Sequence, residues 1–120
     1  MGRSRLIVAI ALLLSATALS ADDSRDAFDH LAEINRASLV MLVEEEIVPR
    51  ELGADIGRAI EQIIAEQQEP DAARSANYLD FEARLVELAG YEATRLHTGR
   101  SRQDIGSTYR RMLQRDALLN

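Results

Sequence analysis

Apolar residues recur every three or four positions through most of the chain after residue 25, and this spacing constrains the fold more than any other feature. Such spacing places apolar side chains on one face of an α-helix, whereas strands alternate at every second position. No stretch of the chain shows the alternation of a strand. The sequence therefore predicts an all-α fold of about four helices.

Acids and prolines set the expected limits of the first two helices. The acids and serine within residues 22–26 are suited to N-cap the first helix, which is expected to stop near Glu46. Pro49 suits the first turn of the second helix, and Pro70 ends it. The two apolar faces are expected to hold Phe28, Leu31, Ile34, Ser38, Met41 and Leu42 in the first helix, and Leu52, Ile56, Ile60, Ile63 and Ile64 in the second.

The last third of the chain predicts two more helices joined by a loop. The third helix is expected over residues 73–89, with Gly90 as its C-terminal stop. Residues 91–102 are expected to form a loop, and the fourth helix begins at about Gln103. The expected apolar faces are Tyr78, Phe81, Leu85 and Leu88 in the third helix, and Ile105, Tyr109 and Met112 in the fourth.

The first 21 residues have the pattern of a secretory signal peptide. Two arginines within residues 1–5 precede an unbroken apolar run, Leu6–Leu14, and small residues follow it. Nine residues are too few for a membrane span, which needs about 20. Cleavage is expected after Ala18, Ser20 or Ala21. The alternatives are a misassigned start codon and a buried N-terminal helix.

Residues 22–120, which follow the predicted leader, are expected to form one small domain in the periplasm or outside the cell. Cysteine and lysine are absent, which excludes disulfides and a catalytic lysine within this chain. His30 and His97 stand alone, so neither indicates a metal site. Removing Arg3 and Arg5 with the leader takes the net charge from −6 to −8. This sign argues against nucleic acid as a partner, because phosphate binding needs a basic face.

The motif HTGRSR lies where the expected loop enters the fourth helix. Unpaired N–H groups at a helix N-terminus stabilise an anion there. Arg100 and Arg102 add forked donors that suit a carboxylate, Thr98 and Ser101 add hydroxyls, and Gly99 lets the backbone approach closely. These features predict a carboxylate site. The alternative is that both arginines pair with acidic residues while Thr98 or Ser101 caps the helix.

The region from Asn77 to Leu113 resembles the first signature region of argininosuccinate lyases, in the aspartase/fumarase superfamily. Those enzymes carry a loop of the form HTGRSRND after a helix of the form IExRLxExxG. Upstream, residues 29–62 resemble the family's helical hairpin only by spacing and apolar pattern. The residues that carry the resemblance are Phe81, Glu82, Ala83, Arg84, Leu85, Glu87, Gly90, Leu96 to Arg102, and Asp104.

The resemblance implies the N-terminal helical domain of a carbon–nitrogen lyase that eliminates fumarate from an N-substituted aspartate. It implies that Ser101, Arg102 and Gln103 contact the fumarate part of an aminodicarboxylate substrate, while Thr98 and Arg100 shape the loop. No cofactor is expected. Gln103 departs from the family, which usually has Asn there, so a substrate other than argininosuccinate is equally compatible with the motif.

A larger departure from the family concerns length. Family members are several times longer, form homotetramers and take their catalytic base from a Ser-rich loop that this sequence lacks, so no catalytic residue is expected within this chain. Leu118 and Leu119 continue the apolar register at the end of the last expected helix. We expect a truncated frame whose fourth helix continues, and whose apolar faces associate into oligomers.

Two hypotheses follow from these observations. In the first, the chain is the N-terminal piece of an exported lyase-like enzyme and is inactive alone. In the second, it is a stand-alone helical binding or assembly module that retains a carboxylate-binding loop without catalysis. The signal peptide favours a periplasmic relative with its own substrate, because argininosuccinate lyases act in the cytosol.

Overall fold

The computed structural model describes residues 25–120, and this part of the chain is helical, without strands. The all-α prediction is confirmed. None of the described helices has the length and apolar character that crossing a membrane requires. The predicted leader and its cleavage points lie outside the described residues. The helices are α2 (Ala27–Glu44), α3 (Arg50–Glu66), α4 (Tyr78–Ala89), the 3-10 helix η1 (Tyr91–His97) and α5 (Arg102–Leu119).

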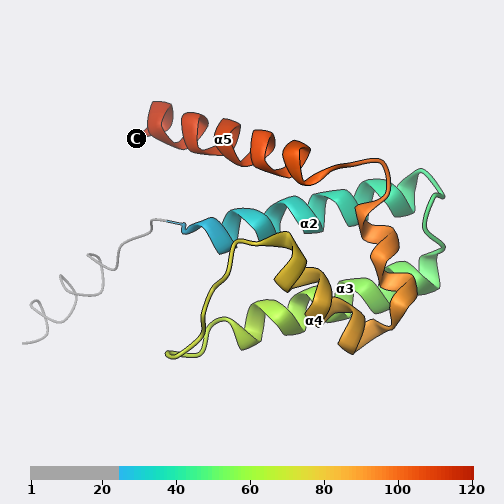
Figure 1. Ribbon diagram of the computed structural model, residues 1–120. Coiled ribbons are helices and arrows are strands. Elements are labelled where there is room, and N and C mark those ends of the chain that lie inside the picture. The colour runs from blue at the N-terminus through green and yellow to red at the C-terminus, as the bar shows by residue number, and fades with distance from the viewer. Residues whose placement is uncertain (1–24) are drawn as a thin grey trace, which may run out of the picture.

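Helix α2 occupies the middle of the fold, between α5 on one side and α3 with α4 on the other (Figure 1). α3 packs along α2, α4 packs on α3, and η1 contacts all three. α5 runs back along α2 in the opposite direction, so its N-terminus lies near the middle of α2 and its second half lies near the start of α2.

The helix starts follow from side chains that accept hydrogen bonds from free backbone N–H groups. Asp26 caps α2 and forms a reciprocal capping box with Asp29, as the acids at this end of the sequence predict. The Asn77 side chain caps α4 by accepting from the Leu79 N–H, whereas Pro49, the N-cap residue of α3, makes no side-chain hydrogen bond there. α2 ends at Glu44, two residues before the predicted end near Glu46. α3 ends at Glu66, four residues before Pro70.

The third helix was expected from residue 73, and this start is wrong. α4 begins at Tyr78. Arg74 has a φ of 48°, a left-handed conformation that no α-helix accommodates. Its guanidinium pairs with Asp26 at 2.5 Å and Asp29 at 2.9 Å, so contacts with the first turn of α2 hold this segment out of helical geometry. Gly90, with a φ of 84°, ends α4 where the sequence predicts.

The expected loop over residues 91–102 is also corrected, because its first seven residues form η1. Ala93 and Leu96 are fully buried and lie three residues apart, which is the repeat of a 3-10 helix. The Thr94 hydroxyl donates to the Tyr91 carbonyl at 2.8 Å. The loop is therefore only residues 98–101. It follows the buried Leu96 of η1 and ends at Ser101, the N-cap residue of α5.

A single apolar core joins the helices. Met41 was expected to face this core, but 46% of its surface is exposed, whereas the adjacent Leu42 is buried. α2 and α3 approach closely at Gly53, where a Cβ would overlap the Val43 side chain. The buried apolar residues are Phe28, Leu31, Ala32, Ile34, Leu42, Val48, Ile56, Ala59, Ile60, Ile63, Tyr78, Phe81, Leu85, Ala93, Leu96 and Ile105.

Candidate functional site: the loop that enters α5

The loop at residues 98–101 is fastened to the middle of α2 by Arg100. One guanidinium nitrogen, Nη2, donates to Asn35 Oδ1 at 2.6 Å, and Nη1 donates to Ser38 Oγ at 2.7 Å. Asn35 is fully buried and Arg100 is half-buried. A forked guanidinium that reaches two neutral acceptors one helical turn apart fixes the height of the loop along α2.

Two stacked rings, Tyr78 on α4 and His97 on η1, lie beside the same guanidinium. The Cζ atom of Arg100 lies 5.1 Å from the centre of the Tyr78 ring, within the range of a cation–π contact. Tyr78 stacks on His97 with ring centres 4.4 Å apart and an interplanar angle of 21°. Burial raises the pKa of Tyr78 to about 12, so its hydroxyl stays protonated at neutral pH.

His97 is held in its neutral form. Arg100 Nε donates to His97 Nδ1 at 3.2 Å, which requires an unprotonated Nδ1. Burial lowers the pKa of His97 below 6.5, and the charges of Arg100 and Arg102 lower it further. The first residue of the HTGRSR motif therefore contributes a hydrogen-bond acceptor that orients Arg100.

The two hydroxyl residues of the motif make local hydrogen bonds. The Thr98 hydroxyl donates to the Arg95 carbonyl at 2.6 Å and so closes the end of η1. Ser101 is the N-cap of α5 and forms a capping box with Asp104, the arrangement that the alternative interpretation of the sequence predicts. Gly99 sits between them with a φ of 74°, a value that glycine adopts without strain.

The capping box also places a negative charge, that of Asp104, at the start of α5. Asp104 Oδ2 accepts from the Ser101 backbone N–H at 2.7 Å and from its hydroxyl at 3.0 Å. These hydrogen bonds lower the pKa of Asp104, with the backbone contact as the larger cause. Asp104 is therefore ionised at neutral pH and satisfies one of the N–H groups at this end of the helix.

Arg102 and Gln103 are the open donors of the site. They are the first two residues of α5, and both side chains are exposed. Within residues 25–120 their side chains have no hydrogen-bond or ion-pair partner, and their backbone N–H groups precede the first intrahelical bond, from Ile105 to Ser101. Two backbone donors, a guanidinium and a carboxamide thus face solvent together.

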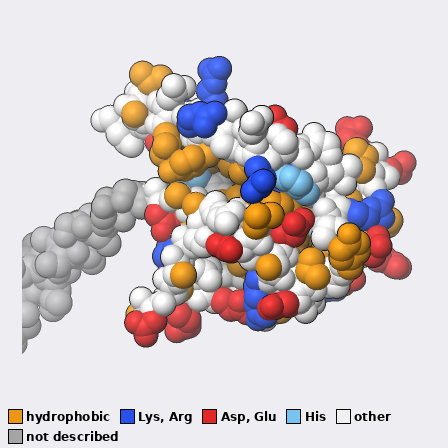
Figure 2. Space-filling view, in the orientation of Figure 1, with side chains coloured by type: hydrophobic (Ala, Val, Ile, Leu, Met, Phe, Trp, Pro, Cys, Tyr) orange, Lys and Arg blue, Asp and Glu red, His pale blue; other side chains and the backbone are white. Residues whose placement is uncertain are grey.

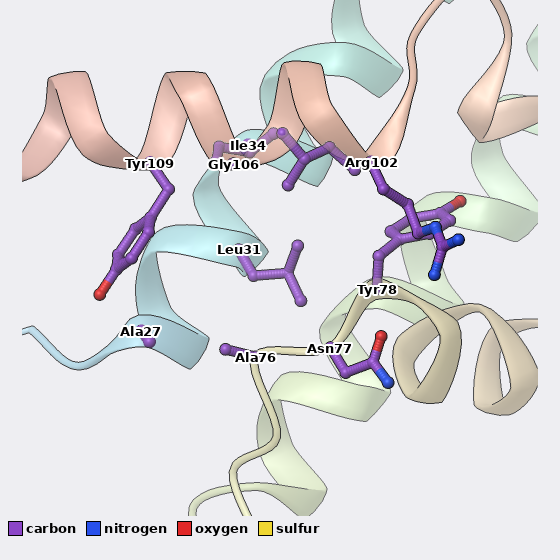
Figure 3. A pocket seen from close by; sticks show the side chains of 10 residues that line it. Ala27, Leu31, Ile34, Ala76, Asn77, Tyr78, Arg102, Gly106 and Tyr109 are labelled. Atoms are coloured by element: carbon purple, nitrogen blue, oxygen red, sulfur yellow. The ribbon is translucent and has the colours of Figure 1, made fainter.

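An apolar cleft of about 220 Å³ opens beside Arg102, between α2, α5 and the segment that precedes α4. Figure 3 shows the Arg102 side chain extending from the first turn of α5 toward Tyr78 and Asn77 at one end of this cleft, with Tyr109 at the other end. Arg102 thus borders both the cleft and an open polar groove that Gln103, Gly106, Ser107 and Arg110 line.

Charge is distributed unevenly over the described surface. Arginine side chains gather over α5, whereas acidic side chains crowd the edge formed by α3, α4 and the turn after α2 (Figure 2). Most arginines elsewhere pair with carboxylates, as Arg36 does with Glu61 and Arg84 with Glu66. Within the described range, Arg102, Arg110 and Arg111 form no ion pair with a carboxylate. The first half of α5, in which Asp104 is the one acidic residue, is therefore a local basic area on an acidic protein.

Sequence reasoning identified the loop but missed the residues that hold it. Asn35, Ser38 and Tyr78 anchor Arg100, and the sequence interpretation placed two of these only on apolar helix faces. The available signal was a pair of polar residues, Asn35 and Ser38, on the otherwise apolar face of α2. Carboxylate binding by Ser101, Arg102 and Gln103 stays a prediction.

Comparison with known proteins finds relatives named argininosuccinate lyase. The enzyme of Synechococcus elongatus is 37% identical over 86 residues, which cover 68% of this chain and 18% of the relative. The Bordetella pertussis enzyme is 38% identical over 65% of this chain, and argininosuccinate lyase 1 of Shouchella clausii is 32% identical over 81%.

The chain spans only about a fifth of the length of these relatives, between 17% and 20%. No protein-family model matches the sequence, and no solved structure matches it. Over 65% to 81% of its own length, then, this all-α chain is similar to one segment of argininosuccinate lyases.

Proposed function

We propose that this chain is the N-terminal part of an exported carbon–nitrogen lyase that eliminates fumarate from an N-substituted aspartate. Similarity to argininosuccinate lyases supports the reaction class. The observation that carries the proposal is that Arg102 and Gln103 are adjacent at the start of α5 and that both have exposed side chains whose donors no described residue accepts. The loop that presents them is held rigidly by contacts that do not involve these two residues.

The geometry fits the demand of such a reaction. Removing a proton from the carbon next to a carboxylate places additional negative charge on that carboxylate before the C–N bond breaks. Preorganised donors stabilise this charge without reorganising during the reaction. Arg102 supplies a guanidinium, and the backbone N–H groups of residues 102 and 103 supply the helix terminus.

The five predicted site residues divide into two roles in this proposal. Arg102 and Gln103 bind the carboxylate directly. Arg100 and Thr98 shape the loop, because the structure engages both of them in hydrogen bonds to α2 and η1. Ser101 adds a contact only through the remaining capacity of its hydroxyl, since Asp104 already accepts from it and donates its backbone N–H to it.

Catalysis requires residues that this chain does not hold. The proposal assigns the base and the remainder of the substrate site to other segments and subunits of a homotetramer, and it assigns the assembly to the periplasm or the extracellular space. Exposed apolar residues on α5 support association, since Leu118 and Leu119 are 86% and 77% exposed.

One observation favours the second candidate function, a stand-alone module without catalysis. Three of the five predicted site residues, Thr98, Arg100 and Ser101, already make internal hydrogen bonds, and the described helices share a closed apolar core. In a module of this kind the loop is a structural link, and Arg102 is a solvated surface charge.

Turnover measurements separate the two candidates. The purified chain alone should release no fumarate from argininosuccinate above the no-enzyme rate, monitored by ultraviolet absorbance. In an active assembly that contains it, Arg102→Ala should lower turnover roughly 10- to 150-fold, the effect of one charge-assisted contact. Arg111→Ala is the matched control, because Arg111 is exposed on the same helix. Full activity of the Arg102→Ala assembly would overturn the proposal.

A further inference from the structure

The apolar cleft beside Arg102 has no role in the binding of fumarate itself. It occupies about 220 Å³ between α2, α5 and the segment before α4. Its inner wall consists of the buried side chains of Leu31 and Ile34 from α2 and Ile105 from α5. Figure 3 shows Leu31 and Ile34 between Arg102 at one end and Tyr109 at the other. The cleft is therefore continuous with the guanidinium that we propose binds a carboxylate.

The cleft exists because three of the residues that line it are small. Ala27 begins α2, Gly106 lies one turn into α5, and Ala76 belongs to the segment before α4. A Cβ added at Gly106 would meet only the Arg110 side chain, at 3.7 Å, so packing does not require glycine there. Glycine within a helix is less favourable than alanine. The absence of a side chain at Gly106 thus costs helix stability and leaves space beside Arg102.

Two hydrogen-bond donors lie at one end of this cleft. Arg102 forms no ion pair with a described residue, and its side chain extends toward Asn77 and Tyr78 (Figure 3). Asn77 Oδ1 accepts from the Leu79 N–H at 3.1 Å, and within residues 25–120 no group accepts from Asn77 Nδ2. A guanidinium and an amide at the end of an apolar cleft suit a ligand with a carboxylate on one side and an apolar group on the other.

The charge of the lining disfavours a cationic substituent. Among the described residues that line the cleft none is acidic, and Arg102 is the one cation. A guanidinium group placed there would lose its water, find no carboxylate in the lining and lie close to the guanidinium of Arg102. An apolar group would displace water from apolar surface without these costs.

The size of the cleft limits the apolar group to about one ring. An engineered apolar cavity of about 150 Å³ binds benzene. At about 220 Å³ the cleft therefore accommodates one ring and a short linker. The aromatic rings of Tyr78 and Tyr109 lie at its two ends, and aromatic rings pack favourably with one another in offset or edge-to-face arrangements.

We infer that this cleft binds the N-substituent of the substrate and selects an apolar group of about one ring. The inference rests on the proposed function and names its substrate class, an aspartate whose nitrogen carries such a group. Arg102 and the start of α5 bind a carboxylate of the aspartate part, and the substituent lies against Leu31, Ile34 and Ile105. The guanidinium group of argininosuccinate does not match this cleft.

Titrations of the purified chain with three ligands, followed by proton–nitrogen NMR, test the inference. N-benzylaspartate should bind roughly 10-fold more tightly than N-methylaspartate, the lower end of the effect of burying a large apolar side chain. Both compounds should shift the amides of residues 102 and 103, and N-benzylaspartate should also shift those of residues 31, 34 and 105. Argininosuccinate should bind no more tightly than N-methylaspartate.

Variants that narrow the cleft test where the ring binds. Gly106→Leu and Ala76→Leu enlarge side chains on two different segments of the lining. Each should remove the advantage of N-benzylaspartate and leave the affinity for N-methylaspartate unchanged. Thr108→Leu is the matched control, because Thr108 is exposed on the same helix and lies outside this cleft. An advantage of the benzyl compound that survives both narrowing variants would overturn the inference.

The same titrations separate failure of the inference from failure of the proposed function. Equal affinity for the benzyl and methyl compounds, with shifts at residues 102 and 103 for both, would overturn the inference and leave the carboxylate site standing. If neither compound nor fumarate shifts residues 102 and 103, the carboxylate site and the inference are both refuted.

Discussion

Replacing Arg100 with alanine removes the anchor of the site loop, and the cost can be worked out from its contacts. The variant loses hydrogen bonds to Asn35, Ser38 and His97 and the contact with the Tyr78 ring. Hydrogen bonds from charged groups contribute about 1.5–3 kcal/mol each. Because Arg100 is half-buried, we take the lower end for each of the two short bonds to α2 and count nothing for the longer bond to His97. The expected loss in the free energy of unfolding is about 3 kcal/mol.

The buried carboxamide makes this loss difficult to recover. Asn35 Nδ2 already lacks a hydrogen-bond partner within the described structure, and the variant would leave Asn35 Oδ1 without one as well. For a domain of this size, 3 kcal/mol corresponds to roughly 10–20 °C in melting temperature. Urea denaturation followed by circular dichroism measures the change.

Two further variants make the test of the Arg100 anchor specific. Arg100→Lys keeps the charge near Tyr78 but not the fork, so it should lose part of the stability. Arg111→Ala removes an exposed arginine from the same helix and should change stability by less than about 0.5 kcal/mol. The reasoning is refuted if Arg100→Ala and Arg111→Ala unfold at the same urea concentration.

Three other predictions concern packing, ionisation and the substrate. Gly53→Ala should destabilise the fold by about 1–3 kcal/mol, because the new Cβ overlaps Val43, whereas Gly57→Ala, whose Cβ would lie 3.5 Å from Leu39, should stabilise α3 by about 0.5–1 kcal/mol; equal melting temperatures would contradict this. An NMR titration should place the pKa of His97 below 6.5, and Arg100→Ala should raise it. Since the folded state favours neutral His97, this residue's contribution to stability is present above the unfolded-state pKa and is lost as the pH falls. Gln103→Asn should raise fumarate release from argininosuccinate in an active assembly if that compound is the substrate, and unchanged turnover would argue for another one.

The sequence predicts those parts of the fold that depend on local patterns. Asp26 with Asp29 and Ser101 with Asp104 show capping spacing, and Gly90 ends a helix as glycine usually does. These features depend on residues within one turn of one another, so they can be read without knowledge of the tertiary structure.

The remaining features depend on contacts between distant residues. Arg74 leaves helical geometry because it pairs with Asp26 and Asp29, more than 40 positions earlier. Arg100 is an anchor because Asn35 and Ser38 happen to face it from α2. No local pattern distinguishes Arg100 from Arg102. Only the structure shows that Arg100 holds the loop on α2 while the Arg102 side chain is exposed.

Fumarate binding by the chain tests the central claim most directly. In proton–nitrogen NMR spectra, adding fumarate should shift the backbone amides of residues 102 and 103 most, and Arg102→Ala should weaken binding by roughly 10-fold or more while Arg111→Ala leaves it unchanged. Shifts spread evenly over Arg102, Arg110 and Arg111, or no shifts at saturating fumarate, would contradict a carboxylate site at the start of α5.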